Sequence, residues 1–183
     1  MSKVFFGGSR SLSRLDSAAR TRLRNLITHG HTVLVGDANG IDKAIQTFFA
    51  EEGYRNVIVY CMEAECRNNV GNWPIESVSS DGKAKDFAYF AVKDARMGLE
   101  ADYGFMIWDG ASKGTLNNVL SLLEQGKAVL VYRSANREFL QIKSIQEFEP
   151  LLGTCPPDVV EYLNKKINLE ERVRTAPQSS LGF

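Results

Sequence analysis

The sequence has no excess of charge of one sign. Its 22 basic residues are balanced by 22 acidic residues, so the formal net charge at pH 7 is +0. Proteins that coat nucleic acids or bind membrane surfaces usually carry a clear basic excess. We therefore expect neither a membrane nor a nucleic acid as a partner, although this composition is compatible with a small local basic site.

Long hydrophobic runs are also missing. No stretch of about 18 apolar residues occurs, which argues against a membrane-spanning helix, and the apolar part of MSKVFFGGSR is too short for a signal peptide. The cysteines Cys61, Cys66 and Cys155 show no CxxC spacing. Since His29 and His31 lie far from them in sequence, we expect free thiols in a reducing compartment, no metal site and a cytoplasmic location.

Two common phosphate-binding patterns are absent. No GxGxxG follows the first apolar run, so the usual dinucleotide fingerprint is missing. The segment GASKGT at 110–115 does not have the spacing GxxxxGK[ST] of a Walker loop. Any nucleotide site in this chain is therefore of another kind.

What the sequence does contain is a series of short apolar runs. They lie at residues 3–6, 32–35, 56–61, 103–108 and 128–132. They are continuous and rich in Val, Ile and aromatic residues, which is typical of strands buried on both faces of a parallel sheet. Apolar residues at helical spacing lie between them. The pattern predicts an α/β fold, a three-layer Rossmann-like doubly wound parallel sheet with strand order 3-2-1-4-5.

The length suits one domain. We assign residues 1–132 to the Rossmann-like nucleotide-binding core and residues 133–183 to a small C-terminal extension of the same domain. The extension is expected to hold an edge strand in EFLQIKSI, a helix in PPDVVEYLNKKI and a loose tail. Residues 62–83 are too long for a simple connection, which indicates a functional or floppy loop.

Three glycine-containing loops leave the carboxyl ends of predicted strands, at 7–12, 36–42 and 108–115. Ligands of open parallel sheets bind at this edge, near the point where strand order reverses. Glycines let backbone N–H groups approach an anion, and a helix start adds unpaired N–H donors. The predicted phosphate ligands are Gly7, Gly8, Ser9, Arg10, Gly110, Ser112, Lys113, Gly114 and Thr115. The plainer alternative is that these are turn residues, with Thr115 as a helix cap.

A second group at the same edge is predicted to contact the ribose or base. Its members are Gly36, Asp37, Arg67, Asn68, Trp73 and Asp109. Asp37 and Asp109 are also the candidate catalytic residues. The alternative is turn stabilisation for Asp37 and a solvated loop carboxylate for Asp109. Trp73 either stacks on a base or anchors the long loop against the core.

At these loops the chain resembles the SLOG superfamily of Rossmann-like nucleotide-binding proteins. GGSR and GDANGID are similar to the two turns of the DNA-processing protein A family. KDARMGLEADYGFMIWDGASKGTLNN is similar to a segment of the Lonely Guy phosphoribohydrolases. The resemblance covers roughly residues 3–132. Relatives with this layout often pair through helices, so the resemblance also allows for a homo-oligomer.

The chain departs from this resemblance at two positions. The phosphoribohydrolases use an arginine where Lys93 stands and a glutamate where Asn118 stands. Because an amide cannot take up a proton, the resemblance implies a sensor or carrier of a small-molecule nucleotide, with a bound nucleotide as the one cofactor that the loops suggest.

Two other functions stay open, and with them the question whether the protein is an enzyme. The first is a hydrolase that cleaves the N-glycosidic bond of a nucleoside or nucleoside monophosphate, with Asp37, Asp42, Asp94 or Asp109 in place of the glutamate. The second is a module that binds single-stranded nucleic acid or protein.

Overall fold

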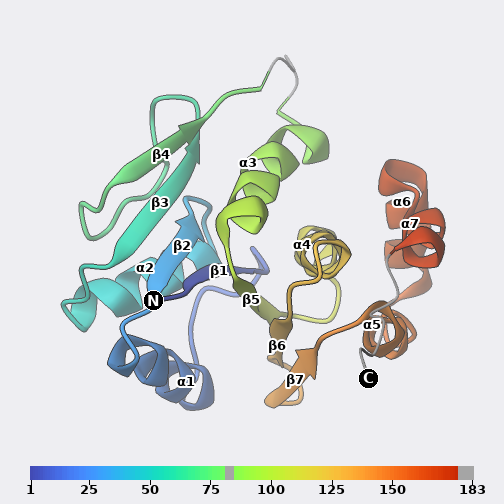
Figure 1. Ribbon diagram of the computed structural model, residues 1–183, viewed down its shortest axis with the longest axis horizontal. Coiled ribbons are helices and arrows are strands. Elements are labelled where there is room, and N and C mark those ends of the chain that lie inside the picture. Colours follow the sequence, from blue (N-terminus) through green and yellow to red (C-terminus); the bar gives the residue numbers. More distant parts are fainter. Residues whose placement is uncertain (81–84, 177–183) are drawn as a thin grey trace.

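A computed structural model describes residues 1–80 and 85–176 of the chain. Its centre is one seven-stranded sheet of order β4-β3-β2-β1-β5-β6-β7 (Figure 1). The strands are β1 (Lys3–Gly8), β2 (Thr32–Gly36), β3 (Val57–Met62), β4 (Ile75–Val78), β5 (Tyr103–Trp108), β6 (Val129–Arg133) and β7 (Glu138–Ile142). All neighbouring strands pair in parallel except β7, which runs antiparallel to β6.

The predicted Rossmann-like α/β fold is confirmed. The five apolar runs form the middle of the sheet as β3-β2-β1-β5-β6, which is the predicted order 3-2-1-4-5. The complete order differs because one further strand is added at each edge. β7 lies within the segment predicted as an edge strand, whereas β4 lies inside residues 62–83, which were predicted as a loop. β4 has no buried residue, so it lacks the apolar run that marked the central strands.

Helices cover both faces of the sheet (Figure 1). They are α1 (Ser17–Thr28), α2 (Ile41–Glu51), α3 (Phe87–Glu100), α4 (Lys113–Glu124), α5 (Ile145–Leu152), α6 (Pro157–Ile167) and α7 (Leu169–Thr175). α1 and α2 lie on one face and α3 and α4 on the other, while α5 and α6 pack against α4. In the part of the chain described by the structure, no helix combines the length and the apolarity that crossing a membrane requires.

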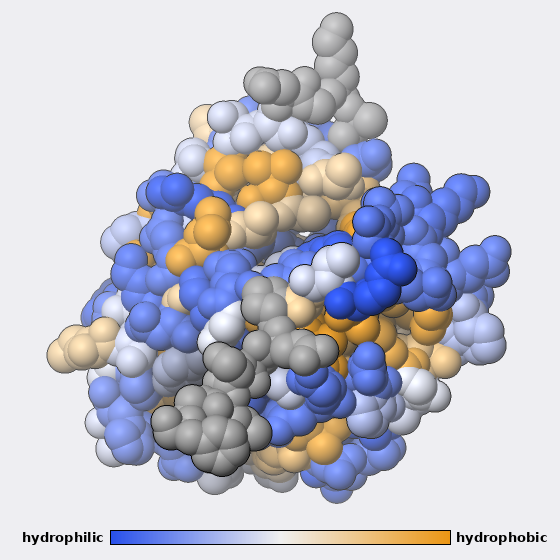
Figure 2. Space-filling model, turned by 45° about the vertical axis from the view of Figure 1, so that its right-hand side comes forward, coloured by the Kyte–Doolittle hydropathy of each residue, from blue (hydrophilic) through white to orange (hydrophobic). Residues whose placement is uncertain are grey.

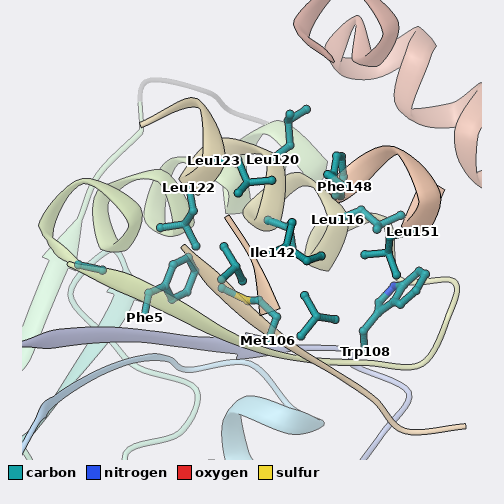
Figure 3. Packing of buried hydrophobic residues seen from close by; sticks show 14 of the residues in the cluster. Phe5, Met106, Trp108, Leu116, Leu120, Leu122, Leu123, Ile142, Phe148 and Leu151 are labelled. Carbon is teal, nitrogen blue, oxygen red and sulfur yellow. The ribbon is translucent and has the colours of Figure 1, made fainter. Parts of the chain in front are cut away.

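The continuous apolar runs result from burial on both faces. Phe5 and Phe6 are neighbours on β1, and their side chains enter two separate hydrophobic clusters because alternate residues of a strand point to opposite faces. Figure 3 shows Phe5 and Met106 beneath the leucines of α4, with Trp108 at the end of β5. Each fully buried side chain of this size contributes about 1.5–3 kcal/mol to stability.

The C-terminal extension is more helical than the sequence indicated. α6 confirms the helix predicted in PPDVVEYLNKKI, but α5 and α7 were not predicted. α7 is fastened to α4 by Arg172, whose guanidinium donates to Glu124 at 2.8 and 2.6 Å and to Asn117 at 2.9 Å. The predicted loose tail lies partly outside the described residues, which end at 176.

The cysteines differ from the prediction. Cys61, at the end of β3, is joined by a disulfide to Cys66 in the following loop, with Cα atoms 5.1 Å apart. The expectation of free thiols is therefore wrong for this pair, because the chain turns back after β3 through Glu63, which has a positive φ of 62°. Cys155 is free, and burial raises the pKa of its thiol to about 11. The cytoplasmic location stays a prediction.

Candidate functional site

A cleft of about 550 Å³ opens at the carboxyl end of β1, between α3 and α4. Figure 2 shows hydrophobic side chains gathered in the upper part of the view, with a hollow beneath them. The cleft brings together part of the predicted site. The predicted residues that line it are Gly7, Gly8, Arg10, Arg67, Asp109, Ser112, Gly114 and Thr115.

The other predicted residues lie outside this lining. They are Ser9, Gly36, Asp37, Asn68, Trp73, Gly110 and Lys113. Ser9 is fully buried, and its hydroxyl oxygen accepts a hydrogen bond from the Asp109 N–H at 3.0 Å. Gly110 adopts a positive φ of 95° in the turn that follows β5, a conformation that favours glycine.

Gly8 is required by packing. A Cβ atom at this position would collide with the carbonyl oxygen of Ile107 on β5 and with the side chain of Ile41 at the start of α2. The glycine therefore lets three elements meet at the cleft, and this need is independent of any ligand.

The turn between β5 and α4 is held by Asp109. Its carboxylate accepts hydrogen bonds from the N–H groups of Ala111 at 3.0 Å and Ser112 at 2.8 Å, and from the Ser11 hydroxyl at 2.5 Å. Burial alone would raise the pKa of Asp109, but these hydrogen bonds outweigh it and lower the pKa. The carboxylate thus stabilises the turn and is poorly suited to act as a base.

The start of α4 supplies donors to the cleft. Ser112 is the N-cap, and its hydroxyl oxygen accepts from the N–H of Thr115 at 3.5 Å and from the Thr115 hydroxyl at 2.9 Å. N–H groups in the first turn of a helix have no acceptor within the helix. Because the cap satisfies only that of Thr115, the N–H groups of Lys113 and Gly114 remain available to an anion.

Four of the described cationic residues line the cleft, Arg10, Arg67, Lys85 and Lys93, and two of them, Arg10 and Arg67, meet at one aromatic ring. Each guanidinium carbon lies 4.9 Å from the ring centroid of Phe90, which faces the cleft from α3. The Lys113 ammonium instead lies 4.4 Å from the ring centroid of Tyr162 on α6. The side chain of Lys113 therefore contacts the C-terminal extension. The local sequence around Lys113 did not predict this contact.

Arg67 is bound to Asp37, the other candidate catalytic residue. Its Nη2 and Nε donate to the two carboxylate oxygens at 2.7 and 3.0 Å, and its backbone N–H donates at 3.0 Å. Burial opposes ionisation of Asp37, but the bonds and charge of Arg67 outweigh it and lower the carboxyl pKa. Asn68 and Gly36 also make hydrogen bonds near Asp37. The Asn68 amide donates to the Asp37 carbonyl at 2.8 Å, and the Gly36 carbonyl accepts from Gln46 at 2.8 Å.

Trp73 anchors the long loop. Its side chain is 5% exposed in the core beside α2, and its indole N–H donates to the carbonyl of Tyr54 at 2.9 Å. This geometry favours the second of the two interpretations of this residue, packing against the core.

Polar residues on the cleft floor form a group that the sequence motifs did not predict. Lys93 Nζ donates to Asp94 Oδ1 at 2.9 Å, and Asn118 Nδ2 donates to Asp94 Oδ2 at 3.1 Å. Asp42 lies close by, and burial raises the pKa of its carboxyl to about 6 although the charge of Lys93 opposes this. Burial would lower the pKa of Lys93, but the charges of Asp94 and Asp42 reverse the effect and raise it. We call Asp42, Lys93, Asp94 and Asn118 the floor cluster.

Gly36 leaves the space that the floor cluster occupies. A Cβ atom on Gly36 would collide with Asp42 Oδ2 and lie 2.5 Å from Lys93 Nζ. One further signal could have located the cluster: Phe87, Phe90, Lys93 and Asp94 follow one another at helical spacing, so they share one face of α3. Both phenylalanines of this face line the cleft, and Phe87 also packs against the buried cluster beneath it.

The fold and the cleft define a Rossmann-like α/β protein with a cleft at the carboxyl edge of its sheet. The chain is similar to the structure of DNA processing protein A from Helicobacter pylori, with a TM-score of 0.56 and 17% sequence identity over 92% of this chain and 80% of that one. That protein is described by its mode of binding single-stranded DNA. No protein-family model and no curated protein matches the chain.

This similarity corrects one expectation and leaves another untested. The exclusion of nucleic acid as a partner is wrong, because a protein with this fold binds single-stranded DNA. The physical reason is that a net charge of +0 describes the whole chain, whereas binding depends on the charge at one site, and two arginines meet at this cleft. The fold supports the resemblance to DNA-processing protein A, while membership of the SLOG superfamily stays a prediction.

Proposed function

We propose that the cleft binds a nucleotide through its phosphate group, as a sensor or carrier of that ligand. The proposal rests on the kinds of chemical group that line the cleft. The start of α4 with its unpaired N–H groups, the exposed guanidinium of Arg10, the aromatic rings of Phe87 and Phe90, and the floor cluster all line the cleft. A nucleotide presents an anion, an aromatic base and a sugar in one molecule, so its three parts match three surfaces.

The guanidinium of Arg10 is available to bind a phosphate. Its side chain is exposed and lies against Phe90, and a guanidinium stacked on a ring keeps its edge donors free. Arg67 is less free, since Asp37 already engages two of its nitrogens. The first turn of α4 adds backbone donors and a partial positive charge beside the same space.

The test is binding of adenosine 5′-monophosphate measured by isothermal titration calorimetry. Arg10→Ala removes a charged hydrogen bond and is expected to weaken binding by about 1.5–3 kcal/mol. Arg55→Ala removes the same charge at an exposed position that does not line the cleft, and serves as the matched control, with unchanged affinity. The assignment is wrong if both variants bind as tightly as the parent protein.

Single-stranded DNA is the second source of the same phosphate chemistry, and the fold similarity favours including it. A thymidine oligonucleotide titrated at several salt concentrations forms the second arm. Binding to a DNA backbone weakens steeply with salt because counterions are released, roughly in proportion to the number of phosphates contacted. Oligonucleotide binding that Arg10→Ala abolishes, without binding of mononucleotides, would assign the cleft to DNA.

A hydrolase acting on the N-glycosidic bond is a second candidate function, and one observation favours it. The resemblance implied a glutamate where Asn118 stands, and the fold brings the carboxylate of Asp94 to 3.1 Å from that asparagine. Such a reaction adds water to the anomeric carbon and protonates the departing base. Release of free base from nucleoside monophosphates, lost in Asp94→Asn and retained in Glu161→Gln, would support it; no release by the parent protein would exclude it.

A further inference from the structure

The floor cluster lies deeper than Arg10. Lys93 is 3% exposed and Asp42 is 9% exposed, whereas the Arg10 side chain is exposed to solvent. The cleft therefore has an exposed cation at its mouth, while its floor places the carboxylates of Asp42 and Asp94 beside the buried Lys93. A ligand that fits this order carries its negative charge outward and its hydroxyl donors inward.

Asp94, on the floor of the cleft, can accept further hydrogen bonds. Each of its oxygens holds one partner, Lys93 at 2.9 Å and Asn118 at 3.1 Å. A carboxylate oxygen can accept about two hydrogen bonds, and the Asp94 side chain remains 24% exposed while lining the cleft. Both oxygens can thus accept from a ligand without losing their present partners.

Lys93 and Asn118 hold this carboxylate in place. The Lys93 ammonium forms an ion pair with this carboxylate at 2.9 Å. Asn118 donates with its amide nitrogen, which leaves its amide oxygen as a second acceptor at the cleft wall. By contrast, the carboxylates of Asp37 and Asp109 each hold at least three hydrogen bonds within the chain.

We infer that the floor cluster binds the vicinal 2′ and 3′ hydroxyls of a ribose, with Asp94 as the acceptor that determines specificity. The inference rests on the proposed function, because it takes the phosphate to lie at Arg10 and the start of α4. It names the ligand class as a ribonucleotide and predicts that 2′-deoxyribonucleotides and DNA bind poorly. The residues that the sequence pattern assigned to the ribose, Asp37 and Asp109, support the loops instead.

The experiment compares the four ribonucleoside 5′-monophosphates with their 2′-deoxy counterparts by isothermal titration calorimetry. The parent protein is expected to bind its best ribonucleotide about ten- to a hundredfold more tightly than the matching deoxynucleotide, as for one lost hydrogen bond to a charged group. Asp94→Asn keeps the shape, removes the charge, and is expected to reduce this ratio to less than about threefold. Arg55→Ala, at an exposed position that does not line the cleft, keeps the full ratio.

The outcomes separate this inference from the proposed function. Equal affinity for both sugars, with Arg10→Ala still weakening both, overturns the ribose assignment and leaves phosphate binding intact. A preserved ratio in Asp94→Asn moves the specificity away from this carboxylate. Absence of binding by all eight monophosphates rejects both proposals. Since the comparison of sugars uses the parent protein, the test holds even if a variant does not fold.

Discussion

Replacing Asp42 by asparagine is expected to stabilise the protein at neutral pH. Asp42 is buried, and desolvation raises the pKa of its carboxyl from the usual 3.8 to about 6. One pKa unit corresponds to about 1.4 kcal/mol, so the ionised carboxylate costs the folded state about 3 kcal/mol at pH 7. Asparagine has nearly the same shape, carries no charge, and can still accept from the Ala38 N–H.

The stabilisation should depend on pH in a defined direction. Because the folded state holds the Asp42 proton more tightly than the unfolded state, protonation of this group favours folding. Below about pH 4 both states are protonated and the variant gains nothing. Between about pH 4 and 6 the gain grows, and above pH 6 it is constant.

Urea unfolding followed by circular dichroism, at pH 7 and at pH 4, measures this gain through the extrapolated free energy of unfolding. Glu161→Gln makes the same change of charge at an exposed position of α6 and is the matched control, with a change within about 0.5 kcal/mol. A variant at Asp42 that is less stable than the parent at pH 7, or a gain of equal size at both pH values, would refute the argument that this buried charge destabilises the fold.

Three further predictions concern stability and use the same urea assay. Gly36→Ala should destabilise by about 1–3 kcal/mol through overpacking against the floor cluster; Gly114→Ala, whose new Cβ meets nothing within 4 Å, is the control, and equal effects would contradict the packing argument. Arg172→Ala should cost about 1–3 kcal/mol because charged hydrogen bonds between α7 and α4 are lost, and an unchanged unfolding midpoint would show that this junction contributes nothing. Reducing the disulfide that links Cys61 to Cys66 across a sequence separation of 5 should cost about 2 kcal/mol of loop entropy. Cys66→Ser should lose the same amount and respond no further to the reductant, whereas a midpoint insensitive to reductant in the parent protein would argue against the bond.

Local sequence information was sufficient for the centre of the fold. A strand buried on both faces must be apolar at consecutive positions, as in Phe5 and Phe6, and this requirement is readable without the structure. The edge strands β4 and β7 show where the rule ends. They are partly exposed, so they need no continuous apolar run, and only β7 was anticipated.

The sequence by itself therefore determined the parallel core, its central strand order and the edge at which the cleft opens, because hydrophobic periodicity and chain connectivity are local properties. Only the tertiary structure decided which side chains face that cleft. Asp42 and Lys93 lie 51 positions apart on α2 and α3, and they meet because Gly36 leaves room beneath them. In the same way, Lys113 contacts Tyr162 and Trp73 packs into the core. The direction of a side chain depends on the partners that folding brings near it, and the neighbouring sequence does not encode those partners.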